Sequence, residues 1–314
     1  MSIETKLFDP TQPVLLYGTT PPRASASAED IENAASKLID RVQALPLDGL
    51  VVYDVQDESA RTEEPRPFPF LPTIDTRRYS QLLHERTGLP AVNYKYVGQM
   101  DAASWQAWLD QSAGQYGIRY LSLVGLPTSR NITRPPEALL LTGATQMAAA
   151  HPSGFTLGGV AIAERHQPPR SESVRMIEKA AAGCQFFISQ AVYSPAATIK
   201  MLEDYTRDCH ERGVVPRRII LTFTPCGNPR TMQFMKWLGI AIPPSTEQAI
   251  LEAASPLAKS IELCCANLKE ILGQNYAKTL PLGLNIESVS IRKDEIDASI
   301  DLFHALREVL YQYA

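Results

Sequence analysis

Eight short apolar runs, rich in β-branched and aromatic residues, recur along this chain of 314 residues. They cover residues 14–20, 50–56, 91–97, 120–125, 156–163, 184–190, 218–225 and 284–290. Segments with helical periodicity separate them, and this alternation predicts βαβ units and a parallel sheet. Eight units favour a closed barrel over an open sheet. We therefore expect an α/β fold, a single (β/α)8 TIM barrel domain over residues 1–314.

The predicted helical segments also support the barrel fold. Ser27 can cap the first helix, with Asp30 three residues later, and an additional helical segment over residues 245–272 precedes the last strand. The other helices are expected at residues 76–87, 102–115, 136–150, 171–182, 194–213, 229–239 and 294–313.

The loop after the first strand argues against a nucleotide-binding open sheet. Such a sheet predicts a glycine-rich phosphate loop there, whereas residues 18–22 read GTTPP. Neither GxGxxG nor GxxxxGK[ST] occurs in the chain. A Rossmann or P-loop nucleotide site is therefore disfavoured.

Composition narrows the class of protein further. The formal net charge of -4 shows no basic surplus, so we expect no nucleic-acid partner. Residues 1–13 lack the apolar core of a signal peptide, and no apolar run approaches the ~20 residues of a membrane span. The five cysteines show no CxxC spacing and the five histidines are scattered. We expect reduced thiols, a cytoplasmic location and no metal site.

In a barrel of this type, polar residues at the carboxyl ends of strands carry the chemistry. The second strand ends near Asp54, Asp57 and Glu58, and the third carries Lys95. A solvated acidic loop and a lysine that only extends toward solvent are the alternative interpretations.

The fifth and sixth strands end in further polar residues. Glu164 and His166 follow the fifth strand, with Arg165 between them as a partner for a local ion pair. Gln190 closes an otherwise apolar sixth strand, where a buried amide needs hydrogen-bond partners. Cys226 has no base nearby in sequence, so a nucleophilic thiol is not expected.

Three motifs in barrel order resemble the methylenetetrahydrofolate reductase family. Residues 17–23 read YGTTPPR and are similar to its strand-one signature, while residues 158–166 read GGVAIAERH and resemble its fifth-strand motif ending in Glu-x-His. Residues 179–190 read KAAAGCQFFISQ, similar to the family's Lys-x-x-x-Gly-Ala-x-x-x-Ile-Thr-Gln. The resemblance spans nearly the whole chain.

The resemblance implies an oxidoreductase of folate one-carbon metabolism. NAD(P)H would supply hydride, through FAD, to 5,10-methylenetetrahydrofolate and give 5-methyltetrahydrofolate. By position it assigns cofactor contacts to Ala161, Glu164, His166, Lys179 and Ile188.

The resemblance also implies substrate contacts. Gln190 matches a glutamine that contacts folate and nicotinamide, and Arg292 or Lys293 falls near a basic position of the family. We add Lys95 as a further candidate for binding substrate.

Two departures from the family pattern affect the chemistry. The strand-one glutamate, a general acid, is replaced by Gly18, and the fourth-strand Leu-Arg-Gly-Asp becomes LVGL at residues 123–126. A carboxylic acid must still protonate the nitrogen that leaves the imidazolidine ring. We hypothesise Glu58 in this role, with Asp54 second, and assign Arg130 to the flavin pyrophosphate or the folate tail.

Three functions stay open at this point, besides another barrel chemistry such as methyl transfer from a folate or reduction of an unrelated imine. The first is a flavin-dependent reductase, and the second is a flavin-free reductase in which nicotinamide delivers hydride directly to the folate. The third is a catalytically silent subunit that binds folate or an active partner. One face of residues 245–272 is a candidate contact for a homo-oligomer, with burial against its own barrel as the alternative; it carries Leu251, Leu257, Ile261 and Leu268.

Overall fold

The computed structural model describes residues 3–59, 62–126 and 134–313, and its eight parallel strands close into a barrel in sequence order. The strands are β1 (Val14–Thr19), β2 (Gly49–Val52), β3 (Ala91–Tyr96), β4 (Tyr120–Val124), β5 (Thr156–Ala161), β6 (Phe186–Ala191), β7 (Arg218–Phe223) and β8 (Leu282–Glu287). The prediction of a (β/α)8 TIM barrel is confirmed.

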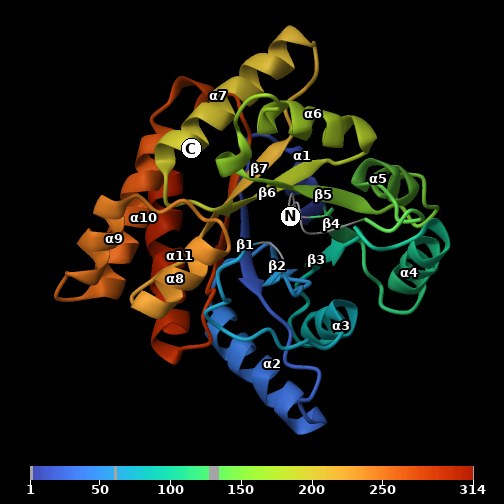
Figure 1. The fold of residues 1–314 in the computed structure, drawn as a ribbon, viewed down its shortest axis with the longest axis horizontal. Coiled ribbons are helices and arrows are strands. Elements are labelled where there is room, and N and C mark those ends of the chain that lie inside the picture. Colours follow the sequence, from blue (N-terminus) through green and yellow to red (C-terminus); the bar gives the residue numbers. More distant parts are fainter. Residues whose placement is uncertain (1–2, 60–61, 127–133, 314) are drawn as a thin grey trace. The chain divides into compact units, whose positions relative to one another are not determined.

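Helices follow the strands along the chain (Figure 1). They are α1 (Ile3–Phe8), α2 (Ala28–Val42), α3 (Thr76–Thr87), α4 (Ala102–Gly114), α5 (Leu141–Ala149), α6 (Glu172–Ala182), α7 (Pro195–Glu211), α8 (Pro229–Trp237), α9 (Pro244–Leu251), α10 (Pro256–Leu272) and α11 (Lys293–Tyr313). Two 3₁₀ turns, η2 (Ala163–Arg165) and η3 (Asn275–Lys278), complete the list.

Several boundaries differ from the sequence prediction. The extra helical segment before the last strand is present, but it is divided into α9 and α10, because Pro256 starts a new helix. The helix expected from residue 136 begins only at Leu141, and α1 was not predicted. The capping box of Ser27 and Asp30 at the start of α2 is confirmed.

The chain divides into two compact units. Unit 1 consists of Met1–Leu15, Ala161–Ile177 and Phe187–Ala314, and unit 2 of Leu16–Val160 and Glu178–Phe186. A single domain over residues 1–314 stays a prediction.

Unit 2 is built around an aromatic cluster on α4. The rings of Trp105 and Trp108 stack with centroids 5.2 Å apart, and the indole of Trp105 donates to the carbonyl of Ala144 on α5 at 2.9 Å. Leu121, Leu123 and Leu157 of the strands pack into the same core. These contacts fix the helix-facing sides of β4 and β5.

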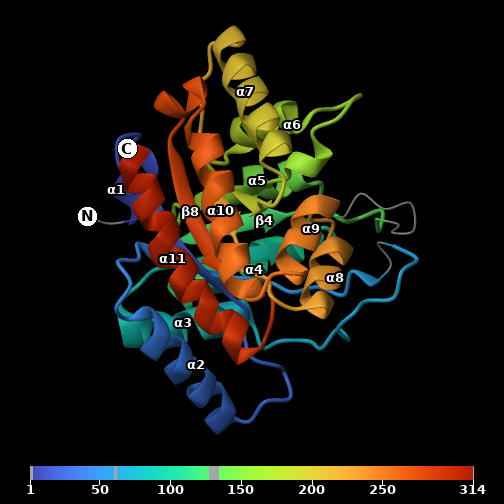
Figure 2. The same ribbon diagram turned by 90° about the vertical axis from the view of Figure 1, so that its left-hand side faces the viewer.

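Unit 1 is fixed by α10 and α11, which contact each other, while α11 also contacts β8 (Figure 2). Glu295 at the start of α11 is buried and accepts hydrogen bonds from the backbone of Gly227 at 3.1 Å and the hydroxyl of Thr231 at 2.8 Å. This carboxylate therefore holds the start of α8. The other end of α8 leads into the segment that contacts the strand-end residues described below.

No helix among the described residues is long and apolar enough to cross a membrane. The cytoplasmic location and the homo-oligomer stay predictions.

Gly158 in β5 gives a direct test of packing in unit 2. A Cβ at this position would lie 2.4 Å from a ring carbon of Phe186. We expect Gly158→Ala to lower the free energy of unfolding by about 1–3 kcal/mol, since the ring must shift. Urea unfolding measures the change.

Gly114→Ala is the matched control, because a Cβ there meets no atom within 4 Å at the end of α4. We expect it to leave stability unchanged or raise it by up to about 1 kcal/mol. Equal stability of the two variants would contradict the packing described for Gly158.

Candidate functional site

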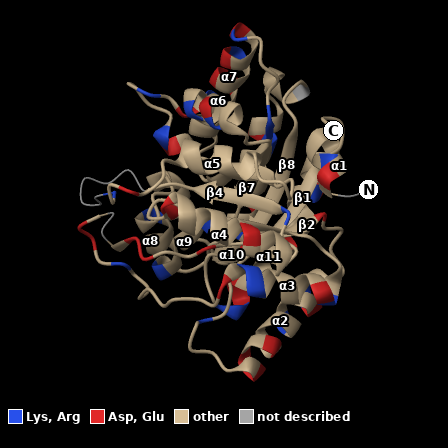
Figure 3. Ribbon diagram, turned by 90° about the vertical axis from the view of Figure 1, so that its right-hand side faces the viewer, with Lys and Arg blue, Asp and Glu red and all other residues tan. Residues whose placement is uncertain are grey.

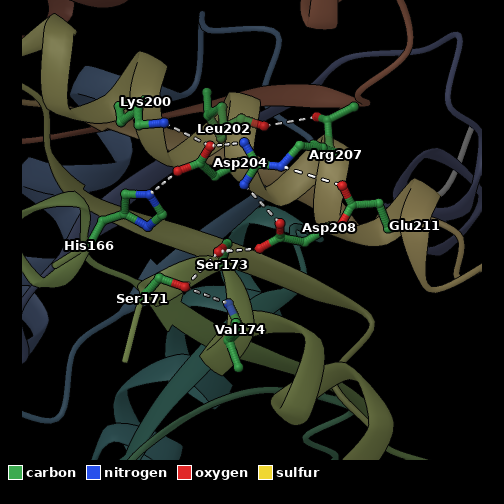
Figure 4. A network of polar contacts seen from close by, with 11 residues as sticks. His166, Ser171, Ser173, Val174, Lys200, Leu202, Asp204, Arg207, Asp208 and Glu211 are labelled. Atoms are coloured by element: carbon green, nitrogen blue, oxygen red, sulfur yellow. Dashed lines mark hydrogen bonds and ion pairs between the residues drawn. The ribbon is translucent and has the colours of Figure 1, made fainter. Parts of the chain in front are cut away.

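In unit 1, His166 follows the η2 turn after β5 and contacts α7. Its Nε2 lies 2.8 Å from the Oδ2 atom of Asp204, and both side chains are largely buried. Figure 4 shows the imidazole directed at the Asp204 carboxylate. A carboxylate on one ring nitrogen fixes the orientation of a histidine and leaves the other nitrogen to meet a partner.

Two cations hold Asp204 from its own helix. Lys200 Nζ lies 2.9 Å from Oδ1, and Arg207 contacts the same oxygen. Burial by itself raises the pKa of Asp204, but hydrogen bonds from Lys200, His166 and Arg207 outweigh it and lower the pKa to about 2. Charges of both signs line α7 (Figure 3). Asp204 is therefore a fixed anion behind His166.

The network continues from α7 to the start of α6. Arg207 contacts Asp208 at 3.0 Å, and the hydroxyl of Ser173 donates to Asp208 at 2.7 Å (Figure 4). The hydroxyl of Ser171 accepts from the backbone N–H of Val174, as a residue that caps a helix does. The segment from His166 to Ser173 therefore contacts α7 through both of its end residues.

The other ring nitrogen of His166 is buried and has no hydrogen-bond partner among the described residues. A buried polar atom without a partner is costly, so this Nδ1 atom is the part of the ring that a ligand or water is expected to satisfy.

Glu164 also lies in the η2 turn, and it contacts the connection between α8 and α9. Its Oε1 accepts a hydrogen bond from the backbone N–H of Ala241 at 3.1 Å. Burial raises the pKa of Glu164, opposed by hydrogen bonds from the backbone N–H groups of Ala241 and of Glu164 itself, and then by the charge of Arg165. The charge of Arg165 acts on this carboxyl, and the local ion pair expected from the sequence stays a prediction.

Gln190 is the next-to-last residue of β6. Phe187 packs on Tyr205 of α7, with ring centroids 6.3 Å apart, so alternation directs Ile188 and Gln190 to the opposite face of the strand, the barrel interior. Its Nε2 donates to the carbonyl of Leu238 at 2.9 Å. That carbonyl lies at the end of α8, where helix carbonyls lack partners within the helix. The predicted need of this amide for a partner is confirmed.

Two residues assigned to the cofactor site are closed off by packing. Ala161 and Ile188 are both 0% exposed. Their side chains support the strand ends, and a cofactor role for them stays a prediction.

Arg292 and Lys293 lie after β8 at the start of α11. Arg292 pairs with Asp294 at 2.8 Å, and both side chains are half exposed. They line an open surface cavity of about 530 Å³ together with Lys293 and Asp297. Two aspartates in this lining oppose an anionic ligand, and the substrate role of the basic pair stays a prediction.

In unit 2, the structure brings Asp54 and Lys95 together. Lys95 Nζ lies 3.6 Å from the Oδ2 atom of Asp54 and 5.5 Å from the ring centroid of Trp108. The same oxygen accepts the backbone N–H of Tyr96 at 3.0 Å, and Oδ1 accepts the amide of Gln56 at 2.8 Å. Both oxygens of Asp54 are therefore occupied as acceptors.

Lys95 lies on the side of β3 that faces the helices. Asn93, two residues earlier on the same side, accepts a hydrogen bond from Ser80 of α3 at 2.9 Å. Tyr94 points the opposite way and packs on Tyr53, with centroids 4.7 Å apart. A substrate contact by Lys95 stays a prediction.

Glu58 is half-buried in the loop after β2. Burial, and then the charge of Glu58, raise the pKa of Tyr96, so the two side chains are neighbours. The role of Glu58 as general acid stays a prediction. Arg130 lies outside the described residues.

Two of the residues matched to flavin contacts each have one polar atom engaged within the protein. Lys179 Nζ donates to the carbonyl of Val160 at 2.5 Å, and Nε2 of His166 is taken by Asp204. A flavin diphosphate needs free cations or backbone donors. Binding of FAD by these residues stays a prediction. No group of three or more metal-binding side chains is found in the described chain either.

Sequence reasoning missed Asp204, Leu238 and Ala241. The charges of α7 at helical spacing predict only solvated ion pairs, and nothing in the sequence links Asp204 to a histidine 38 residues away. The two partners of the strand-end residues in the α8–α9 connection are backbone groups, which carry no sequence signal.

One solved structure similar to this chain is a protein from Clostridium thermocellum. It is 33% identical over 98% of this chain and 99% of that chain, with a TM-score of 0.82. This chain belongs to the family of that protein. The clostridial protein is described as uncharacterized and as binding two copies of 5-methyl-5,6,7,8-tetrahydrofolic acid. No protein-family model and no curated protein matches the chain.

Replacing Asp204 tests the anion behind His166. Because its pKa is lowered from 3.8 to about 2, it stabilises the fold above pH 3.8 and loses this effect as the pH falls toward 2. We expect Asp204→Asn to lower the free energy of unfolding at pH 7 by about 1–2 kcal/mol. The difference from wild type should narrow below pH 3.8.

Urea unfolding at several pH values measures both effects. Asp301→Asn, on the exposed side of α11, is the control and should change stability by less than about 0.5 kcal/mol. A deficit of Asp204→Asn that stays constant down to pH 3 would contradict the assignment.

Proposed function

We propose that this protein binds a reduced folate at the carboxyl ends of its barrel strands. We further propose that it is a methylenetetrahydrofolate reductase-like oxidoreductase. The observation that carries the proposal is its family relation to a protein that binds 5-methyltetrahydrofolate, over nearly the full length of both chains. The order of the three sequence motifs adds the reductase chemistry to the binding.

Gln190 is the residue best prepared to bind the pterin. Its Nε2 is anchored on the Leu238 carbonyl, so its carbonyl oxygen is held in one orientation at the end of β6. An oriented amide oxygen accepts an N–H from a pterin ring or from a nicotinamide carboxamide. Anchoring the other end of the amide lowers the entropy lost when the ligand binds.

In the proposed reaction the methylene carbon of 5,10-methylenetetrahydrofolate accepts hydride from NAD(P)H. The carbon–nitrogen bond to N10 breaks, N10 takes a proton, and the nicotinamide is oxidised. The protein must orient the two ring systems and supply the proton, which together account for much of the catalysis in such steps.

A direct transfer from nicotinamide to folate is the version that we favour. The polar atoms matched to flavin contacts, Lys179 Nζ and His166 Nε2, are bound within the protein, and the fourth-strand Arg and Asp are replaced by Val124 and Leu126. The flavin-dependent version is the first alternative. A subunit that binds folate without turnover is the second alternative.

Calorimetric titration with 5-methyltetrahydrofolate tests the binding. We expect saturable binding by wild type and about 10- to 100-fold weaker binding by Gln190→Ala, since one oriented hydrogen bond is lost. Gln248→Ala, on the exposed face of α9, is the matched control and should bind as wild type does. Absence of binding by wild type would remove the proposal.

A second measurement separates the flavin-free enzyme from its alternatives. Purified protein should lack the flavin absorbance band, and added FAD should not raise its melting temperature. It should oxidise NADH or NADPH only when 5,10-methylenetetrahydrofolate is present. Turnover that requires FAD would support the flavin-dependent version, and folate binding with no turnover would support the silent subunit.

A further inference from the structure

We propose that Glu164 is the residue that protonates N10 as the imidazolidine ring opens. This inference rests on the proposed function. It names the acid that takes the place of the strand-one glutamate, which is absent at Gly18.

The first argument is the position of the carboxyl group. Glu164 lies in the η2 turn directly after β5, at the carboxyl end of a barrel strand, where such folds place their reacting groups. Ala241 N–H holds its Oε1 at 3.1 Å, and the backbone N–H of Glu164 itself also donates to the carboxylate. Backbone donors thus orient the carboxyl group, and no side chain of another described residue donates to it.

The second argument is the distance to the proposed pterin-binding amide. Gln190 is anchored at Leu238 and Glu164 at Ala241, so both are tied to one short segment. Three residues of chain span at most about 11 Å. Gly239 has φ +84° and turns the chain between them, which shortens that span. A pterin bound to Gln190 therefore lies within reach of Glu164.

The third argument is the electrostatic setting. Burial raises the pKa of Glu164, which favours a protonated carboxyl at higher pH than a solvated glutamate allows. The charged groups on the elements packed around it are Arg165 in its own turn, Lys200, Asp204 and Arg207 on α7, and Lys236 with Glu247 beside the α8–α9 connection. Lys200 and Arg207 on α7 both pair with Asp204, Arg207 pairs also with Asp208, and Lys236 is paired with Glu247.

The acids predicted from the sequence are less suited to this step. Both oxygens of Asp54 accept hydrogen bonds, and Lys95 lies 3.6 Å away. Glu58 is the remaining candidate for the general acid, and Glu58→Gln distinguishes it from Glu164.

The step balances without a further reactant. Glu164 gives its proton to N10 as the bond between N10 and the methylene carbon breaks, and the resulting N5 iminium accepts hydride from NAD(P)H. The products are 5-methyltetrahydrofolate, oxidised nicotinamide and a carboxylate, which regains a proton from water.

The test is the pH profile of kcat/KM for NAD(P)H-dependent reduction of 5,10-methylenetetrahydrofolate. An acid must be protonated to act, so wild-type activity should fall as the pH rises above the pKa of Glu164. We expect Glu164→Gln to lose about 10²- to 10⁴-fold in kcat and to lose this limb of the profile. Its amide oxygen still accepts from Ala241, and Glu164→Asp should recover part of the activity.

Two controls keep the outcomes distinct. Glu85→Gln, on the exposed face of α3, should keep wild-type rates. Glu164→Gln should bind 5-methyltetrahydrofolate within about 3-fold of wild type, because the proton that Glu164 donates matters only in the transition state. Failure of wild type to bind folate or to turn over removes the proposed function itself. The role of Glu164 is overturned if Glu164→Gln keeps the wild-type pH profile. It is also overturned if the fall in activity at high pH disappears in Glu58→Gln instead.

Discussion

Closure of eight parallel strands is the constraint on which the structure depends. Within such a barrel, alternate residues of each strand face the interior or the helices, and both faces are filled by packing. β7 illustrates this, since all of its residues from Arg218 to Phe223 are buried. Polar chemistry can then appear only where a strand ends and its side chains meet a turn.

The polar residues after β5 and β6 are held by the protein before any ligand arrives. His166 is fixed by Asp204, Glu164 by the Ala241 N–H, and Gln190 by the Leu238 carbonyl. His166 keeps its Nδ1 atom, and Gln190 its carbonyl oxygen, without a partner among the described residues. Groups that are fixed at one atom and available at another are prepared to bind a polar ligand at small entropic cost.

The supporting contacts come from distant parts of unit 1. Glu295 of α11 holds the start of α8, and the end of α8 provides the carbonyl that receives Gln190. The segment after α8 provides the N–H that receives Glu164. One helix, α8, thus connects α11 with the strand-end residues.

The sequence located the strand ends well where a strand is long and apolar. Gln190 was identified because one amide closes an apolar run, and the structure places it at the end of β6 with the carbonyl of Leu238 as its partner. The end of β2 was harder to predict, since the strand ends at Val52 and Asp54 lies beyond it. Its carboxylate turns to the backbone of Tyr96, a contact that depends on how β3 lies beside β2.

The amino-acid sequence by itself determined the barrel, the order of its elements and the polar residues at the strand ends. These follow from local periodicity and from the alternation of strands with helices, which residues near in sequence encode. Only the tertiary structure decided which of those residues are engaged and which keep an available atom. The partners are backbone groups and helix residues tens of positions away, such as Asp204 for His166 and Leu238 for Gln190, and long-range packing alone brings them together.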